Sequence, residues 1–285
     1  MSNALRCGRE EGLIYSFSRW TDLPAAKWPW FQERLEEGWF VGINPRTALP
    51  GKWSLKPEDT LGLVFWTRDP TNLIRNAKLL QDYPLVIHMT VTGWHEVEKG
   101  APDMTRALFL LEQAVEKFGP DKIVWRFSPV PLVDDAVERF QKMAAAAESL
   151  GLQEVYVAFL QENDYLPETR PMRVRRELLH HLAASTKLRV RLCAEQTSTW
   201  INTQTPANLG IGVCEDGGRF VSLGGTQSRG FSPRELPIEG CGCALAVDPF
   251  TINESCVFGC AYCYAADEKL TPHKRNTTKR HLPVT

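Results

Sequence analysis

The sequence predicts an α/β protein built as a TIM-like (βα) barrel, and three observations lead to this fold class. Short apolar runs rich in Val, Ile and Phe alternate with longer amphipathic stretches, which is typical of βα units around a parallel sheet. Most successive strand patterns are about 22 to 36 residues apart, close to the length of one such unit. A barrel of roughly 250 residues commonly forms a single domain, so a chain of 285 residues is long enough to contain one.

The predicted strands are the apolar runs bounded by turn residues. In chain order they are Leu13–Phe17, Trp39–Ile43, Leu61–Trp66, Leu85–Val91, Lys122–Phe127, Glu154–Leu160 and Leu188–Cys193. The predicted helices lie between them, at Pro24–Glu37, Asn72–Asp82, Met104–Phe118, Asp134–Leu150 and Pro171–Thr186. Apolar side chains recur there at the helical repeat, and Pro24 and Pro171 suit a first helical turn.

Beyond Cys193 the character of the chain changes. Residues 197–243 are rich in Gly, Thr, Ser, Asn and Pro and show no long apolar period, which predicts a loop-rich insert. Ala244–Phe250 has the pattern of one more strand and Tyr262–Leu270 that of the helix after it, so residues 244–270 are expected to form a closing βα unit. The predicted organisation is barrel units over residues 1–196, the insert, the closing unit, and a basic tail over residues 271–285.

Composition limits the classes of protein to consider. A hydrophobic content of 43% and a charged content of 24% are typical of a globular protein, and the net charge of −1 shows no overall basic excess of the kind that usually accompanies a nucleic-acid partner. No signal peptide and no long apolar run is visible, so we expect a cytoplasmic protein without a membrane partner. The eight cysteines are then expected to be metal ligands or reactive thiols rather than a disulfide framework.

Three cysteines near the C-terminus carry the strongest chemical signal. Cys256, Cys260 and Cys263 follow the spacing C-x3-C-x2-C. Three thiolates in one loop can ligate three irons of a [4Fe–4S] cluster and leave the fourth iron open to an exchangeable ligand. The alternatives are a zinc site that takes a fourth ligand from elsewhere, and buried reduced thiols.

This cysteine loop resembles the cluster loop of the radical S-adenosylmethionine (SAM) enzymes, in which an aromatic residue, here Tyr262, precedes the third cysteine. In that superfamily the open iron binds the amino and carboxylate groups of SAM, and the loop opens the catalytic barrel. The loop comes last in this chain. The resemblance therefore implies a barrel that is partial or circularly permuted, with the last strand beside the first and with Ser16, Ser18 and Arg19 nearest the methionine carboxylate of SAM.

Polar side chains follow most of the predicted strands. Ligands of parallel α/β sheets and barrels bind at the carboxyl ends of the strands, so these side chains are expected to share one rim. Arg68, Arg126 and His95 are expected to face a substrate there, because arginine binds carboxylate or phosphate and histidine transfers protons. The alternative for each arginine is an ion pair that ties two loops together.

Four further cysteines suggest a second metal site. Cys193, Cys214, Cys241 and Cys243 could close a structural zinc site or an auxiliary iron–sulfur cluster, although their spacing is scattered. The alternative is that Cys193 and Cys214 are small apolar core residues.

Several motifs together resemble a bacterial family known as domain of unknown function 1848. In order they are Ser18–Ala25, Asn44-Pro45, Phe65–Pro70, Val124–Pro129, Cys193–Glu195 and the C-terminal cysteines. The resemblance runs over nearly the whole chain. It implies that the three loop cysteines are cluster ligands and that Arg19, Asp22, Thr67 and Arg126 are rim residues, and it implies no particular substrate.

The leading hypothesis is a radical-SAM-like enzyme that cleaves SAM reductively and abstracts hydrogen from a substrate at the barrel rim. Such chemistry needs a one-electron reductant such as flavodoxin or ferredoxin. One alternative is a [4Fe–4S] protein that transfers electrons or senses without catalysis. Another is a zinc-stabilised protein that binds nucleic acid or phosphorylated ligands through its basic stretches.

Overall fold

The computed structural model describes residues 13–18, 21–44, 49–131, 133–159, 171–193, 205–225, 243–244, 246–249 and 256–263 of the chain. Its helices are α1 (Leu23–Ala26), α2 (Trp28–Glu37), α3 (Thr71–Arg75), α4 (Met104–Phe118), α5 (Ala136–Ser149), α6 (Met172–Ala184) and α8 (Gly217–Ser222). Its strands are β1 (Leu13–Phe17), β2 (Trp39–Ile43), β3 (Pro50–Ser54), β4 (Thr60–Thr67), β5 (Leu85–Thr90), β6 (Ile123–Val130), β7 (Glu154–Phe159), β8 (Arg189–Leu192), β9 (Leu209–Ile211) and β10 (Ala246–Pro249). Short 3-10 helices lie at η1 (Pro57–Asp59), η2 (Ala77–Leu80) and η3 (Pro120–Lys122).

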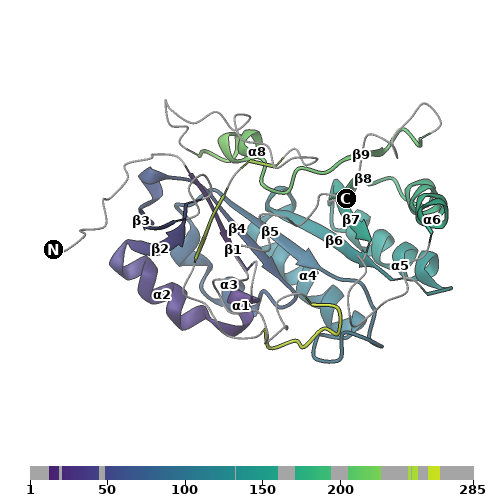
Figure 1. Cartoon of the computed structure of the whole chain (residues 1–285), viewed down its shortest axis with the longest axis horizontal. Helices are drawn as coiled ribbons and strands as arrows, with labels where there is room; N and C mark the ends of the chain where they lie inside the picture. Colours follow the sequence, from purple (N-terminus) through teal and green to yellow (C-terminus); the bar gives the residue numbers. More distant parts are fainter. Residues whose placement is uncertain are drawn as a thin grey trace.

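The strands form one mixed sheet of ten strands in the order β3-β2-β10-β1-β4-β5-β6-β7-β8-β9 (Figure 1). The run from β10 to β9 is parallel throughout, whereas β2 is antiparallel to both β10 and β3. The predicted α/β class with a parallel sheet is therefore confirmed. The predicted place of the last strand beside the first is confirmed as well, because Ile14 pairs with Ala246 and Tyr15 with Val247.

The closed barrel that the sequence predicts is not formed by the described strands. The sheet is open: β3 and β9 are its two edges and do not pair with each other. At the β10 edge the hairpin of β2 and β3 continues the sheet in the antiparallel sense, where a barrel would need a parallel partner. In addition, α8 lies against the sheet face that a barrel would enclose, and the interior of an eight-stranded barrel holds side chains rather than a helix.

The two faces of the sheet are covered differently. Helices α1 to α6 pack against one face and bury the larger core, which includes Phe31 of α2, Phe65 of β4 and Phe140 of α5. The second face carries a smaller core under α8. There Phe220 of α8 lies directly on Gly62 of β4, since a Cβ at residue 62 would come within 2.0 Å of the Phe220 ring.

Several predicted elements differ locally from those observed. The single helix predicted over Pro24–Glu37 is divided at Lys27 into α1 and α2. Pro29 lies in the first turn of α2 and has no N–H to continue the hydrogen bonds of a preceding helix, so a new helix begins there. The helix predicted over Asn72–Asp82 is α3 followed by η2. The insert predicted as loop contains β9 and α8, and residues 264–270 of the predicted last helix lie outside the described residues.

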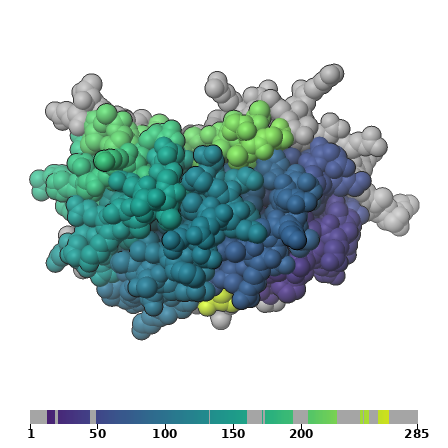
Figure 2. All heavy atoms as spheres, turned by 180° about the vertical axis from the view of Figure 1, so that it is seen from behind, coloured from purple at the N-terminus to yellow at the C-terminus, as the bar shows by residue number. Residues whose placement is uncertain are grey.

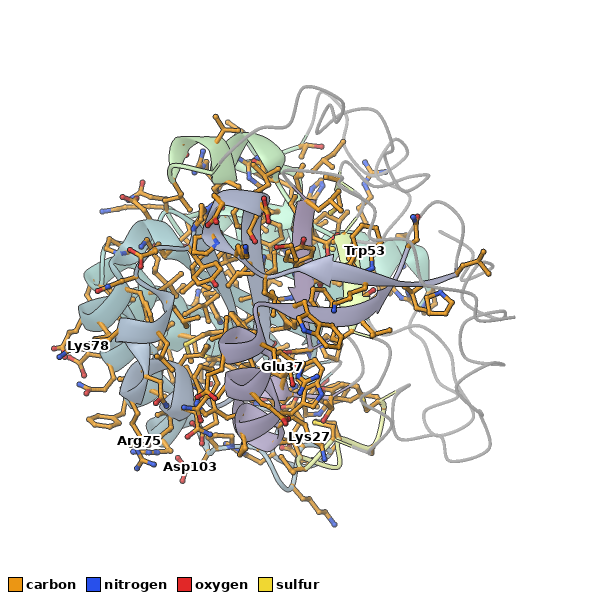
Figure 3. All side chains as sticks on the ribbon, turned by 90° about the vertical axis from the view of Figure 1, so that its left-hand side faces the viewer. Lys27, Glu37, Trp53, Arg75, Lys78 and Asp103 are labelled. Carbon is orange, nitrogen blue, oxygen red and sulfur yellow. The ribbon has the colours of Figure 1, made fainter. Side chains whose placement is uncertain are left out.

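Helix α4 shows how local signals set an element's ends. It spans the predicted residues, and its N-cap Asp103 accepts a hydrogen bond from the backbone N–H of Arg106 at 2.8 Å. Gly119, with φ of 85°, ends it. In Figure 3 the exposed charges of Arg75, Lys78 and Asp103 lie on the outer side of the helix layer. None of the helices in the described ranges is long and apolar enough to cross a bilayer.

Candidate functional site

The cysteine loop, residues 256–263, packs on the turns that follow β5 at the carboxyl-terminal edge of the parallel strands. The backbone N–H of Ala261 donates to the carbonyl of Val97 at 2.9 Å. A Cβ at Gly100 would come within 2.5 Å of the carbonyl oxygen of Phe258, so only glycine allows the two backbones to approach so closely. Figures 1 and 2 show the loop at the edge of the molecule opposite α8.

Arg68, Glu98 and Tyr262 form a buried polar cluster, the edge network, that holds this loop. Arg68 follows β4 and makes a bidentate ion pair with Glu98, with N···O distances of 2.9 and 2.8 Å. Its Nη2 also donates to the hydroxyl of Tyr262 at 2.5 Å, and that hydroxyl donates to Glu98. Tyr262 lies directly before the third cysteine, so the loop is tied by a side chain to the ends of β4 and β5.

Two residues of the turn after β5 complete the edge network. Thr92 donates to Glu98 at 2.6 Å, and the ring of Trp94 stacks on that of Tyr262 with centroids 5.8 Å apart. Burial raises the pKa of Tyr262 well above its usual value, so the phenol keeps its proton and donates it. For Arg68, burial disfavours the charged form, but the negative charge of its neighbours outweighs burial and raises its pKa.

Asp22 joins the loop after β1 to the end of β4. It caps α1 by accepting from the N–H of Ala25 at 3.2 Å, and it accepts from the Thr67 hydroxyl at 2.8 Å and from the backbone N–H of Arg68 at 2.7 Å. Burial raises the pKa of Asp22 to about 7, although the three donors oppose this shift. Asp22 and Thr67, predicted as rim residues, are thus brought together at the edge that carries the loop.

The three loop cysteines lie close enough to influence one another. Burial raises the pKa of Cys256 and raises that of Cys260 to about 11, and in both cases the charge of Cys263 adds to the shift. The turn between the first two cysteines contains Gly259 with φ of 54°, a left-handed conformation that glycine adopts without strain. Among the described residues, no three His, Cys, Asp or Glu side chains are already arranged as a bound metal ion would require.

The other predicted edge residues have different places. Ser18 has φ of 106°, and its hydroxyl accepts from the N–H of Leu23 at 3.3 Å, so it stabilises the turn into α1. His95 is exposed, and no hydrogen bond joins it to the edge network within the part of the chain that the structure describes. Arg19 lies outside the described residues.

Arg126 and Ser16 lie on the second face of the sheet, not at the edge network. Ser16 accepts from the indole N–H of Trp66 at 3.1 Å. The guanidinium of Arg126 lies over the Trp66 ring, 4.6 Å from its centroid, and only 8% of Arg126 is exposed. The expectation that Arg126 and Arg68 face one shared site finds no support in the contacts of either side chain.

Three of the four scattered cysteines gather on this second face; we call Cys193, Cys214 and Cys243 the thiol group. The sulfurs of Cys193 and Cys214 are 3.2 Å apart, and the backbone N–H of Cys214 donates to the sulfur of Cys243 at 3.0 Å. Arg126 donates to the sulfur of Cys214 at 3.2 Å. Cys241 lies outside the described residues, so a metal site of all four cysteines stays a prediction.

Sequence reasoning assigned no functional role to Glu98 of the edge network, or to His88 and Tyr156, which lie beside Arg126 on the second face. Glu98 follows a strand end beside Glu96, and only tertiary burial distinguishes the two. His88 lies in β5, stacks on Trp66, and has Nε2 3.0 Å from the carbonyl oxygen of Cys214. The alternation of side chains along β5 and β6 places His88 and Arg126 on one face, and this signal could have paired them.

The family model described as "Domain of unknown function (DUF1848)" matches residues 14–265. The match covers most of the chain, so the protein belongs to this family. No curated protein matches the chain.

Proposed function

We propose that this protein is a radical-SAM-like iron–sulfur enzyme. Cys256, Cys260 and Cys263 would ligate a [4Fe–4S] cluster, and its open iron would bind SAM at the carboxyl-terminal edge of the parallel strands. The observation that carries the proposal is the position of the loop. It lies at the edge where parallel α/β sheets bind their ligands, and the edge network ties it there.

The donor set favours an iron–sulfur cluster over zinc. Three thiols in one short loop supply the three soft ligands that a [4Fe–4S] cluster with an open iron requires. A structural zinc site is usually built from paired C-x2-C elements and needs a fourth protein ligand, whereas this loop supplies three thiols in a C-x3-C-x2-C spacing. The fit rests on ligand chemistry and spacing.

A cluster of this kind, once reduced by a flavodoxin or ferredoxin, supplies the electron for reductive cleavage of SAM, which leads to hydrogen abstraction from a substrate. The chain's own residues position and shield this site. Arg68 and Glu98 hold Tyr262, and Trp94 covers the Tyr262 ring, so water has little access to that side of the loop. The charge of Asp22 contributes to the raised pKa of Cys256, so protonation of Asp22, whose pKa is about 7, would favour the Cys256 thiolate that ligation needs.

Anaerobic reconstitution with iron and sulfide, followed by dithionite and SAM, tests the proposal. We expect about four irons per chain, an electron paramagnetic resonance signal that changes when SAM is added, and production of 5′-deoxyadenosine. Cys7→Ala, which leaves both cysteine groups intact, is the matched control for cysteine loss.

Each alternative has its own outcome. A cluster that neither responds to SAM nor yields 5′-deoxyadenosine would leave an electron-transfer or sensing protein. Stoichiometric zinc in the protein as isolated, with no cluster after reconstitution, would favour the zinc-stabilised binding protein.

A further inference from the structure

The sulfurs of Cys193 and Cys214 are placed for chemistry with each other. β8 and β9 are neighbouring parallel strands, and the two cysteines follow these strands at the same end of the sheet. Their sulfurs are already 3.2 Å apart, so a small movement would bring them to bonding distance.

The two sulfurs are in hydrogen-bond contact. A contact of 3.2 Å suits one thiol that donates a hydrogen bond to the sulfur of a neighbouring thiolate.

Arg126 provides the charge that such a thiolate needs. Its guanidinium is buried, and within the described residues it makes no ion pair with a carboxylate. Its hydrogen-bond partners are the sulfurs of Cys214 and Cys193. A buried cation is costly unless an anion accompanies it, so the site favours one ionised thiol.

Thiol–disulfide exchange needs one thiol that attacks a disulfide and a second thiol that resolves the mixed disulfide. Cys193 and Cys214 differ in pKa and in exposure, as these two roles require. The pKa of Cys193 is lowered to about 7, chiefly because Cys214 donates a hydrogen bond to its sulfur and then because of the charge of Arg126. The pKa of Cys214 is raised well above its usual value by hydrogen bonds to Cys193 and Cys243 and by burial. Cys193 is also the more accessible thiol of the pair, since it is partly exposed and Cys214 is buried.

We propose that Cys193 and Cys214 form a second redox site, a dithiol that reacts with disulfide-bearing partners by thiol–disulfide exchange. The Cys193 thiolate attacks one sulfur of a disulfide RSSR, forms a mixed disulfide, and releases one RSH after protonation. The Cys214 thiol then loses its proton and attacks Cys193, forms the Cys193–Cys214 disulfide, and releases the second RSH. Overall, two protein thiols and RSSR give one protein disulfide and two RSH.

Neighbouring side chains position the resolving cysteine. His88 Nε2 contacts the carbonyl oxygen of Cys214, and the sulfur of Cys243 accepts from its backbone N–H. These contacts fix residue 214 from both of its backbone polar groups, so its sulfur stays directed at Cys193. Cys243 has a positioning role in this scheme.

Exchange with oxidised glutathione, followed by thiol blocking and peptide mass mapping, tests the proposal on the full-length reconstituted protein. Wild-type protein should yield the Cys193–Cys214 disulfide. Cys214→Ser should trap glutathione on Cys193, because no resolving thiol is present, and Cys193→Ser should give neither product. This trapping experiment requires no change at the buried arginine.

The role of Arg126 has its own readout. Arg126→Gln should slow the reaction at pH 7 by about fivefold, as expected when the attacking thiol's pKa rises by about one unit from about 7, and the difference should vanish above about pH 9. Arg219→Gln is the matched control, because Arg219 lies on the same face and pairs with Glu154 and not with sulfur. It should leave the rate unchanged.

Two results would overturn the proposal. One is a Cys214→Ser protein in which glutathione modifies Cys193 no faster than Cys7. The other is zinc or iron that remains bound after Cys256, Cys260 and Cys263 are replaced and that protects Cys193 and Cys214 from alkylation.

Discussion

The cysteine loop and the thiol group each place cysteines beside a buried arginine, and the arginines have different partners. At the edge, Arg68 is neutralised by the bidentate pair with Glu98, and burial raises the pKa of Cys260. On the second face, Arg126 has sulfur partners and no carboxylate partner among the described residues, and the pKa of Cys193 is lowered. Burial raises the pKa of Cys260 although Arg68 opposes it, whereas a hydrogen bond from Cys214 and then the charge of Arg126 lower that of Cys193, so the two regions are expected to differ in which cysteines are ionised before any cofactor binds.

The largest effect is expected from the loop cysteines themselves. Cys260→Ala removes a ligand from the middle of the C-x3-C-x2-C spacing, so iron bound after anaerobic reconstitution should fall to background. Iron and sulfide analysis measures it, with Cys7→Ala as the control. Full iron content in Cys260→Ala would mean that the loop does not carry the cluster.

Removal of the Glu98 carboxylate should leave Arg68 without a carboxylate partner, as Arg126 is among the described residues of the second face. Glu98→Gln leaves Arg68 buried without its anion, so unfolding should become easier by about 3–5 kcal/mol. The matched control is Glu96→Gln, which breaks an ion pair of Arg139 with a carboxylate 55% exposed and should cost less than about 1 kcal/mol. Urea unfolding compares them; equal losses would show that burial of the edge network contributes little.

The second face of the sheet should also contribute less to the stability of the fold at acid pH. Burial, together with the charge of Arg126, lowers the pKa of His88 well below 6.5, so the folded protein keeps this imidazole neutral while the unfolded chain binds a proton. Its contribution to stability is complete above about pH 6.5 and is lost below it, by up to about 1.4 kcal/mol per pH unit.

His88→Gln should flatten that dependence between about pH 6.5 and 5, a window set by the unperturbed histidine pKa. The exposed His95 is the control, and His95→Gln should keep the wild-type slope. Thermal or urea unfolding as a function of pH measures the slopes; an unchanged slope in His88→Gln would contradict the assignment.

A substitution that changes no cysteine should weaken iron retention by the cysteine loop and leave the thiol group unaffected. This effect is expected to be smaller than the others. Gly100→Ala places a Cβ against the Phe258 carbonyl, so the loop must shift and retain iron less well, by a few-fold in its rate of loss to a chelator. The rate of thiol–disulfide exchange at Cys193 should not change. The neighbouring exposed Lys99→Ala is the control, and an effect of Gly100→Ala on Cys193 alone would contradict the packing of the loop.

Local patterns predicted much of the fold. The bounds of α4 and β1 match the prediction, because the helical repeat with its cap and a compact apolar run specify them within a few residues. The parallel sheet was predictable from the order of βα patterns, and the pairing of β10 with β1 from the resemblance of the cysteine loop to that of the radical-SAM enzymes. The open edge was not, because the hairpin of β2 and β3 depends on which strand becomes its neighbour.

Part of the candidate site was predictable from local sequence patterns, and part of it was not. The cysteine spacing is local and visible in the sequence, and so are Asp22 and Thr67 through the family resemblance. The role of Glu98 depends on tertiary burial beside Arg68. Arg126 was expected at the rim, yet it lies inside the predicted strand Lys122–Phe127, and the alternation of side chains along β6 places its side chain on the second face.

Thiol labelling of the whole chain at pH 7, read by mass spectrometry before and after anaerobic reconstitution, tests the central claim most directly. Before reconstitution, Cys193 should react first and Cys260 slowly, because their pKa values lie on opposite sides of the usual thiol value. After reconstitution, Cys256, Cys260 and Cys263 should be protected while Cys193 reacts as before. Loop cysteines that stay reactive, together with a protected Cys193, would contradict the account.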